Sequence, residues 1–278
     1  MIKICAFADE ASEKISGQIA AMKRNGISML EIRGVDGTNI SEISADKARE
    51  VRRMLDAEGM SVWSMGSPIG KISLGDDFAP HVESFKRILE NADILGASKI
   101  RLFSFFPIKG ESDEVTLQKV LERMSVLCDL TPDHITLCHE NEKKIYGETP
   151  ERCLDIHKAF PKVRAVFDPA NFVQCDVDTL HAWELLKDYV EYMHIKDARA
   201  DHVVVPAGQG LGNIAAIAKQ YIAQGGQVFT MEPHLNIFAG LDKLENGESL
   251  KAGVQNYANN DEAFDAGVGA FKSIVATL

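Results

Sequence analysis

Short apolar runs alternate with helix-like segments along the whole chain. Most of these runs lack polar–apolar alternation, which indicates parallel strands that are covered on both faces. The runs are Ile2–Phe7, Met29–Ile32, Met60–Ser64, Lys99–Ser104, Ile135–His139, Val163–Phe167, Val190–Ile195 and Gln227–Met231. Eight strand-and-helix units close a barrel, whereas a doubly wound sheet more often has about five or six strands. The pattern therefore predicts an α/β fold, a single (β/α)8 (TIM) barrel, with one domain over residues 1–278.

Helix boundaries fit the same alternation. Thr149-Pro150 predicts an N-cap followed by proline at the first helical position. Glycines stand where four helices should end before the next strand, at positions 26, 59, 96 and 225. We predict a last helix over Asn260–Leu278, after a long excursion over Phe238–Asn256 that lies over or beside the site.

Composition excludes several classes of protein. The chain has 30 Lys and Arg against 41 Asp and Glu, a net charge of −11, which disfavours nucleic-acid binding. Five cysteines without C-x-x-C spacing indicate free thiols in a reducing compartment. The N-terminus lacks a long apolar stretch, and no uncharged run reaches about 18 residues. We therefore expect a cytoplasmic protein without nucleic-acid or membrane partners, and a homo-oligomer is compatible with the sequence.

Four metal-capable side chains stand at the ends of the fifth to eighth predicted strands: Glu140, Asp168, His194 and Glu232. In such a barrel the active site lies at the carboxyl ends of the strands. One carboxylate at a strand end is usually a helix cap or a solvated loop residue, but capping hardly explains four in succession. Three carboxylates and one imidazole suit one divalent ion, Mn²⁺, Mg²⁺, Co²⁺ or Zn²⁺.

Other histidines and acids near these motifs are expected to have structural places. Neighbours in a strand alternate in direction, so His139 should pack among the helices, and Glu142 should lie in the following loop. The histidines of helical segments are expected at the surface, namely His81, His157 and His181.

The four motifs resemble the xylose isomerase-like barrel superfamily of sugar (phosphate) isomerases and epimerases. The resemblance covers essentially the whole chain and rests on His139-Glu140-Asn141-Glu142, Asp168-Pro-Ala-Asn171, His194-Ile-Lys-Asp197 and Met231-Glu232-Pro233. It implies that the four strand-end residues are the metal ligands, with Glu140 and Glu232 also acting as the acid/base pair. Many ketose 3-epimerases of this superfamily carry a histidine three residues after the metal aspartate, where this chain has Asn171.

The expected reaction is isomerisation or epimerisation of a small sugar or sugar derivative. A metal that chelates a hydroxyl and the adjacent carbonyl oxygen would stabilise the enediolate formed by proton loss, and two carboxylates would move the proton. Polar side chains near the strand ends complete the predicted substrate-binding set: Arg33, Lys71, Arg101, Asn171, Lys196, Arg199 and His234.

Several alternatives remain open. The same site could serve a dehydratase of the inosose dehydratase type, and Lys196 could form a Schiff base in an aldolase. A non-catalytic sugar-binding barrel is disfavoured because all four ligand positions are filled. Apurinic-site endonucleases of the superfamily need extra histidines, and the third and fourth strand ends here offer Ser64, Ser67, Ser104 and Phe105.

A glycine-rich segment, Gly208-Gln-Gly210-Leu-Gly212, precedes a predicted helix. It lacks the spacing of a dinucleotide site, so we predict a loop that lines the pocket. Its backbone N–H groups could bind an anionic substrate.

Overall fold

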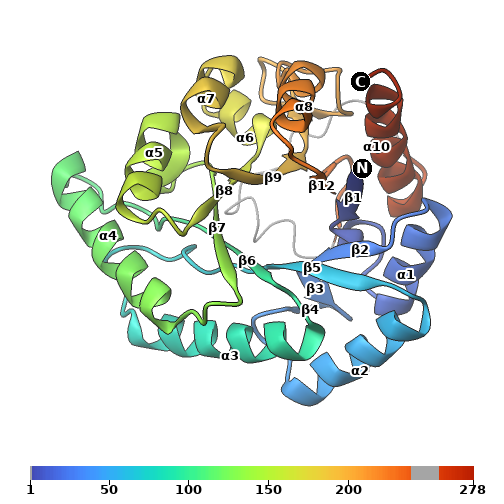
Figure 1. Cartoon of the computed structure of the whole chain (residues 1–278), viewed down its shortest axis with the longest axis horizontal. Coiled ribbons are helices and arrows are strands. Elements are labelled where there is room, and N and C mark those ends of the chain that lie inside the picture. The colour runs from blue at the N-terminus through green and yellow to red at the C-terminus, as the bar shows by residue number, and fades with distance from the viewer. Residues whose placement is uncertain (1, 239–256) are drawn as a thin grey trace.

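Eight parallel strands form a closed barrel in the computed structural model, which describes residues 2–238 and 257–278. Around the barrel the strands follow chain order, with the last strand pairing with the first (Figure 1). The strands are β1 (Lys3–Ala6), β2 (Met29–Ile32), β5 (Ser61–Gly66), β6 (Lys99–Leu102), β7 (Thr136–Glu140), β8 (Arg164–Phe167), β9 (Val190–Ile195) and β12 (Val228–Met231). The prediction of a (β/α)8 barrel is confirmed.

Helices surround the barrel, and each predicted strand is followed by at least one of them (Figure 1). They are α1 (Ile15–Arg24), α2 (Ala45–Ala57), α3 (Ala79–Leu95), α4 (Asp113–Leu130), α5 (Pro150–Ala159), α6 (Pro169–Gln174), α7 (Thr179–Leu186), α8 (Ile214–Ala223) and α10 (Asn260–Val275). The loops contain two short 3-10 helices, η1 (Ala8–Glu10) and η2 (Tyr146–Glu148). They also contain two two-stranded sheets, β3 (Gly34–Val35) with β4 (Thr38–Asn39) and β10 (Asp197–Ala198) with β11 (Val204–Val205).

Two predicted helix boundaries, the start of α5 and the end of α3, are confirmed. The Thr149 side chain accepts a hydrogen bond from the Arg152 N–H and caps α5, with Pro150 at the first helical position. Gly96 ends α3 in the left-handed region, at φ 72°, which only glycine adopts without strain. The predicted excursion beyond Phe238 falls almost entirely outside the described residues.

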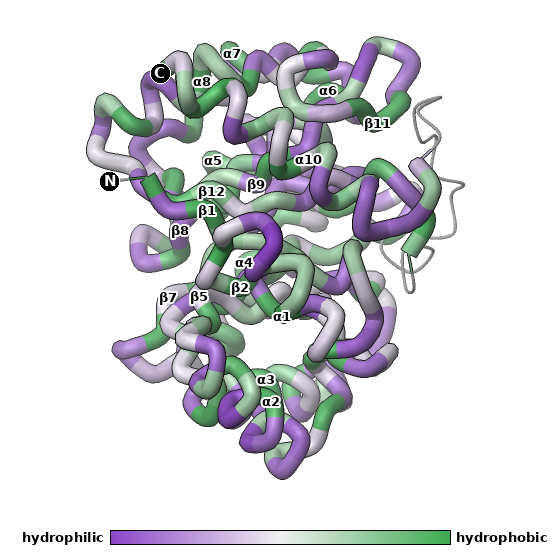
Figure 2. Tube along the Cα trace, turned by 90° about the vertical axis from the view of Figure 1, so that its right-hand side faces the viewer, coloured by the Kyte–Doolittle hydropathy of each residue, from purple (hydrophilic) through white to green (hydrophobic). Residues whose placement is uncertain are grey.

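The barrel interior is layered because residues two apart in a strand share one face. Cys138, Val166 and Tyr192 form an apolar layer together with Cys5 and Val228, and these residues come from five neighbouring strands of the barrel. The next inward position along three of these strands is Glu140, Asp168 or His194. The apolar layer thus lies directly beneath the polar strand ends. Figure 2 shows hydrophobic residues along the central strands and hydrophilic ones on outer helical turns such as those of α2.

The histidines of the helices are placed differently from the prediction. His181 is exposed as expected, but His157 is buried and His81 is half-buried. His157 lies on the inner face of α5, where its ring stacks on Tyr189 and its Nδ1 lies 3.0 Å from the carbonyl oxygen of Val163. His139 packs against the His157 ring, which agrees with its predicted place among the helices.

We expect the buried His157 to make the protein sensitive to acid. Burial lowers the pKa of His157 from 6.5 to about 4, so between these two pH values the unfolded chain binds a proton that the folded chain does not. Stability conferred by this residue should therefore fall by about 1.4 kcal/mol per pH unit on acidification in this range. His157→Phe keeps a ring against Tyr189 but cannot titrate. Denaturant unfolding from pH 6 to 4.5 should show the variant gaining on wild type by that slope, and a constant difference would contradict it.

Among the described residues, the helices are too short or too polar to span a bilayer. All five cysteines carry free thiols.

Candidate metal centre

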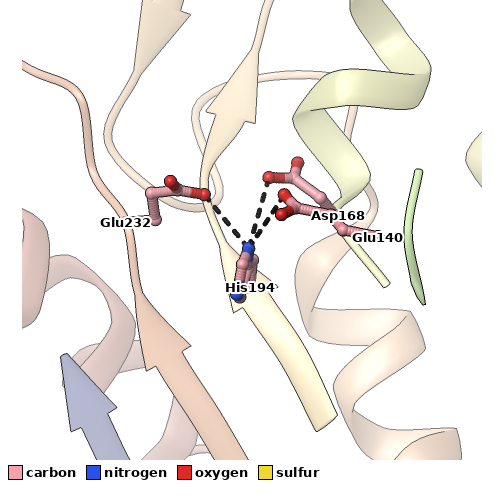
Figure 3. Close-up of side chains that lie close together, drawn as sticks. All are labelled: Glu140, Asp168, His194 and Glu232. Carbon is pink, nitrogen blue, oxygen red and sulfur yellow. Dashed lines mark hydrogen bonds and ion pairs between the residues drawn. The ribbon is translucent and has the colours of Figure 1, made fainter. Parts of the chain in front are cut away.

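The carboxyl ends of four successive barrel strands bring the four predicted side chains together (Figure 3). Glu140 ends β7, Asp168 follows β8, His194 lies in β9 and Glu232 follows β12. All four are buried, and one potential ligand atom from each lies within 4.8 Å of the others. We call these four residues the strand-end cluster.

His194 lies at the centre of the cluster. Its Nδ1 lies 3.0 Å from Oε1 of Glu140, 3.1 Å from Oε2 of Glu232 and 4.0 Å from Oδ2 of Asp168. In Figure 3, Glu232 approaches this nitrogen from one side, and Glu140 and Asp168 approach it from the other. Three carboxylates from different strands therefore converge on one imidazole nitrogen.

Two asparagines hold Asp168 and Glu140 in place by hydrogen bonds. The Asn141 side chain bridges β7 and β8, because its amide donates to the Asp168 carbonyl and accepts from the Asp168 N–H, both at 2.9 Å. Oδ1 of Asp168 accepts the Asn171 N–H and caps α6, which leaves Oδ2 for the cluster. The Asn171 side chain donates to Oε1 of Glu140 at 3.3 Å.

The donor set fits a divalent metal ion. Oδ2 of Asp168 and Oε2 of Glu232 are buried oxygens that accept no hydrogen bond, so their contacts are electrostatic alone. Carboxylates around the site outnumber the fixed cations: Asp9, Glu10, Glu31, Glu140, Asp168 and Glu232 against Arg33, Arg101 and Lys196. Three carboxylates and one imidazole nitrogen suit Mn²⁺, Mg²⁺, Co²⁺ or Zn²⁺.

The same excess of negative charge governs the pKa values. Burial alone lowers the pKa of His194, but Glu140, Glu31 and Glu232 together raise it well above its usual value. Burial raises the pKa of Asp168 to about 6. Burial also acts to raise the pKa of Glu140, but His194 and Arg101 outweigh it and lower that pKa to about 2. The centre of the cluster thus favours a positive charge.

Three buried cations pair with the carboxylates of the cluster. Arg101 Nη1 lies 2.5 Å from Oε2 of Glu140, and Arg33 Nη1 lies 2.8 Å from Oε1 of Glu232. Lys196 Nζ lies 3.0 Å from Oδ2 of Asp168. Each of the two glutamates therefore directs one oxygen to an arginine and the other to His194.

The remaining predicted substrate-binding residues have different places. His234 Nε2 lies 3.4 Å from Oε1 of Glu232, and Lys71 pairs with Glu142 at 3.0 Å. Arg199 is exposed and pairs with Asp201, and it has no contact with the cluster among the described residues. The β10–β11 hairpin turns the chain back here, as the Arg199 N–H donates to the Val203 carbonyl. The structure thus does not bring Arg199 to the site.

One buried acid, Glu31, was not predicted as a site residue. Its Oε2 lies 3.1 Å from Nε2 of His194, and its Oε1 accepts a hydrogen bond from the Tyr192 hydroxyl at 2.7 Å. Glu31 lies within the apolar run Met29–Ile32, where a carboxylate in a strand covered on both faces needs a buried partner. A charged residue inside an apolar strand is therefore the sequence feature that could have identified Glu31 as a site residue.

The glycine-rich loop binds an internal anion. The N–H groups of Gly208, Gly210 and Gly212 donate to the Asp197 carboxylate at 2.8, 3.0 and 2.8 Å, and the Ala198 N–H donates at 2.9 Å. A Cβ atom on Gly210 would lie 2.3 Å from Oδ1 of Asp197, so only glycine fits. The expectation that these N–H groups bind an anionic substrate is wrong, because Asp197 already occupies them.

We expect Asp197→Ala to destabilise the protein by about 3 kcal/mol or more, because it leaves the N–H groups of the loop, including the buried ones of Ala198 and Gly212, without their charged acceptor. Sulfate at millimolar concentration should then raise the melting temperature of the variant more than that of wild type, since an anion can re-enter the vacated loop. Asp201→Ala, at an exposed position after the same strand, is the control. Equal responses of wild type and Asp197→Ala to sulfate would contradict the expectation.

Comparisons with known proteins agree with this architecture. The family model described as "Xylose isomerase-like TIM barrel" matches residues 19–248. No curated protein sequence matches the chain.

Solved structures share the fold at low identity. A D-allulose 3-epimerase from Methylomonas sp. is 16% identical, with a TM-score of 0.75 and 98% of each chain covered. The probable 3-DHS dehydratase AsbF of Bacillus anthracis is 14% identical, with a TM-score of 0.74 over 98% of this chain and 99% of the other. The IOLI protein with a bound zinc atom is 15% identical, with a TM-score of 0.73 over 99% of both. With the family model matching most of its length, this chain belongs to the xylose isomerase-like TIM barrel family.

Proposed function

We propose that the protein is a divalent-metal-dependent isomerase or epimerase of a small sugar or sugar derivative. The observation that carries this proposal is the approach of Glu140 and Glu232 to one nitrogen of His194 from opposite sides (Figure 3). Two carboxylates on opposite faces of a substrate allow one to remove a carbon-bound proton and the other to return it from the opposite face, which inverts that carbon. The likeness to a D-allulose 3-epimerase supports the same reaction class.

Glu140, Asp168, His194 and Glu232 would hold the metal ion. When bound, the ion supplies a positive charge that polarises a substrate carbonyl and favours loss of the neighbouring proton. The chain's own residues then divide the work. Glu140 and Glu232 accept and return the proton, and Arg101 and Arg33 hold the outer oxygens of these two carboxylates in place.

Other polar side chains at the cluster are proposed to bind substrate hydroxyls. Asn171, Lys196 and His234 each contact a residue of the cluster, and Lys71 pairs with Glu142 in the loop after β7. Arg199 is not part of this proposal because it lies at the surface with Asp201.

A dehydratase is the second candidate. Lys196 lies 3.0 Å from Asp168 and 3.6 Å from Glu232, so an ammonium group lies beside one of the two proposed proton-transfer carboxylates, Glu232. Such a group could protonate a departing hydroxyl after the neighbouring carbon loses its proton. The likeness to AsbF, a probable 3-DHS dehydratase, points the same way. A conjugated product that absorbs in the ultraviolet would distinguish dehydration from epimerisation.

An aldolase that forms a Schiff base is less well supported. The nucleophile would be neutral Lys196, yet Asp168 and Glu232 outweigh burial and raise the pKa of this lysine well above its usual value. Borohydride should therefore fail to trap a ketose on the protein.

The test of the proposed function is hydrogen exchange at carbon. The protein is loaded with Mn²⁺ and incubated in D₂O with free ketohexoses, D-fructose and D-allulose among them, and deuterium beside the carbonyl is measured by NMR. We expect exchange that EDTA abolishes and Mn²⁺ restores. Exchange that persists in EDTA, or no exchange and no product with any ketose tested, would contradict the proposal.

We further propose one domain over residues 1–278, a cytoplasmic location and a small-molecule partner rather than nucleic acid. The free thiols support the cytoplasmic location, and the net charge of −11 argues against a nucleic-acid partner.

A further inference from the structure

Glu31 lies inside the barrel on the side of His194 that faces away from the strand-end cluster. Its side chain is fully buried, as is that of His194. Oε2 of Glu31 lies 3.1 Å from Nε2 of His194, whereas the three carboxylates of the cluster surround Nδ1. The two ring nitrogens point in different directions, so Glu31 is not placed to share an ion bound at Nδ1.

Two hydroxyl groups fix the other oxygen of Glu31. Tyr192 donates to Oε1 at 2.7 Å and Ser64 donates to the same atom at 3.3 Å, while the two hydroxyls lie 3.2 Å from each other. Tyr192 is two residues before His194 in β9, so both side chains point into the barrel. With both oxygens engaged, the carboxylate of Glu31 has one orientation.

The His194 ring is also held by packing. The Phe7 ring meets it edge-on with centroids 5.2 Å apart, and the Tyr192 ring lies 5.6 Å away. Packing restricts how far the ring can turn, but it does not choose which nitrogen carries the proton. Only a charged or hydrogen-bonding group at one nitrogen makes that choice.

We propose that Glu31 is the positioning residue of the metal centre. By accepting the Nε2–H of His194, it keeps the proton on Nε2 and leaves the Nδ1 lone pair free to bind an ion among Glu140, Asp168 and Glu232. A buried carboxylate at Nε2 also makes the imidazole a more basic ligand. This inference rests on the proposed metal site and adds a residue outside the ligand set.

The first measurement is the Zn²⁺ dissociation constant, obtained by competition with a chromophoric chelator. Glu31→Leu removes the acceptor and should weaken Zn²⁺ binding by up to about 100-fold, and Glu31→Gln, which keeps an oxygen acceptor without the charge, by about tenfold. Tyr192→Phe is the matched control, because it removes a partner of Glu31 and leaves the contact to His194. Its loss of affinity should be the smallest of the three.

The second measurement is independent of turnover. In Zn²⁺-loaded protein labelled with ¹⁵N-histidine, NMR should show a His194 ring with its proton on Nε2 and its Nδ1 bonded to zinc. Glu31→Gln should keep this signature and Glu31→Leu should lose it. Should Glu31→Leu fail to fold, as judged by circular dichroism, the affinity of Glu31→Gln decides the matter.

The outcomes separate the two claims. Wild type that binds no Zn²⁺ would overturn the metal centre and this inference with it. Wild type that binds Zn²⁺, with unchanged affinity and an unchanged ring signature in both Glu31 variants, would overturn the role of Glu31 alone.

Discussion

His194→Ala and Asp168→Asn should lose metal affinity by well beyond the roughly 10–100-fold typical of residues that only support a ligand. His194→Ala removes the nitrogen on which three carboxylates converge. Asp168→Asn removes a charge but keeps an oxygen that can accept the Asn171 N–H and cap α6, so the fold should be retained. Isothermal titration with Mn²⁺ measures the loss.

The matched control is Arg199→Ala. Arg199 follows the same strand as His194 but pairs with Asp201 at the surface, so this variant should bind Mn²⁺ as wild type does. Full affinity in His194→Ala would show that the ion binds elsewhere.

Glu140→Gln and Glu232→Gln should each lower turnover by about 10²–10⁴-fold, the usual cost of losing a general base. A glutamine oxygen can still bind an ion, but its amide cannot accept a proton. Each variant should fail in both directions of an epimerisation, because one carboxylate removes the proton from one epimer only. Each should still exchange the substrate's acidic hydrogen with D₂O from the face that its remaining carboxylate serves.

Arg101 and Arg33 make a loss of turnover in these variants harder to assign, because the substitutions can also weaken metal binding. Each glutamate gives one oxygen to an arginine and the other to His194, and a glutamine can supply only one oxygen. Mn²⁺ affinity must therefore be measured in the same samples. Near wild-type turnover with metal bound in both variants would place the base elsewhere, with Lys196 or His234 as the next residues to test.

The barrel could be predicted because its strands are covered on both faces. A buried parallel strand reads as a short apolar run, and the alternation of eight such runs with helices has few other solutions. The ends of the strands were less certain, since β7 reaches Glu140, one residue beyond the predicted run. The place of His157 could not be read from its helical segment, because one histidine does not reveal which face of α5 packs inward.

The four strand-end residues could be listed from the sequence because parallel strands in a barrel end at one face. The same rule failed for Arg199, where the β10–β11 hairpin carries the chain away from that face. It also missed Glu31, because the ligands were sought only on the fifth to eighth strands, although Glu31 has the same penultimate place in β2 that His194 has in β9. Partners across the barrel, such as Tyr192 and His194, are set by closure of the sheet and not by spacing in the chain.

Anomalous diffraction from a crystal grown with Mn²⁺ tests the metal centre most directly. We expect one manganese peak within bonding distance of Glu140, Asp168 and Glu232 and of Nδ1 of His194, with Nε2 still facing Glu31. Four separated side chains with no peak between them, or a peak bound by other residues, would contradict the proposed centre.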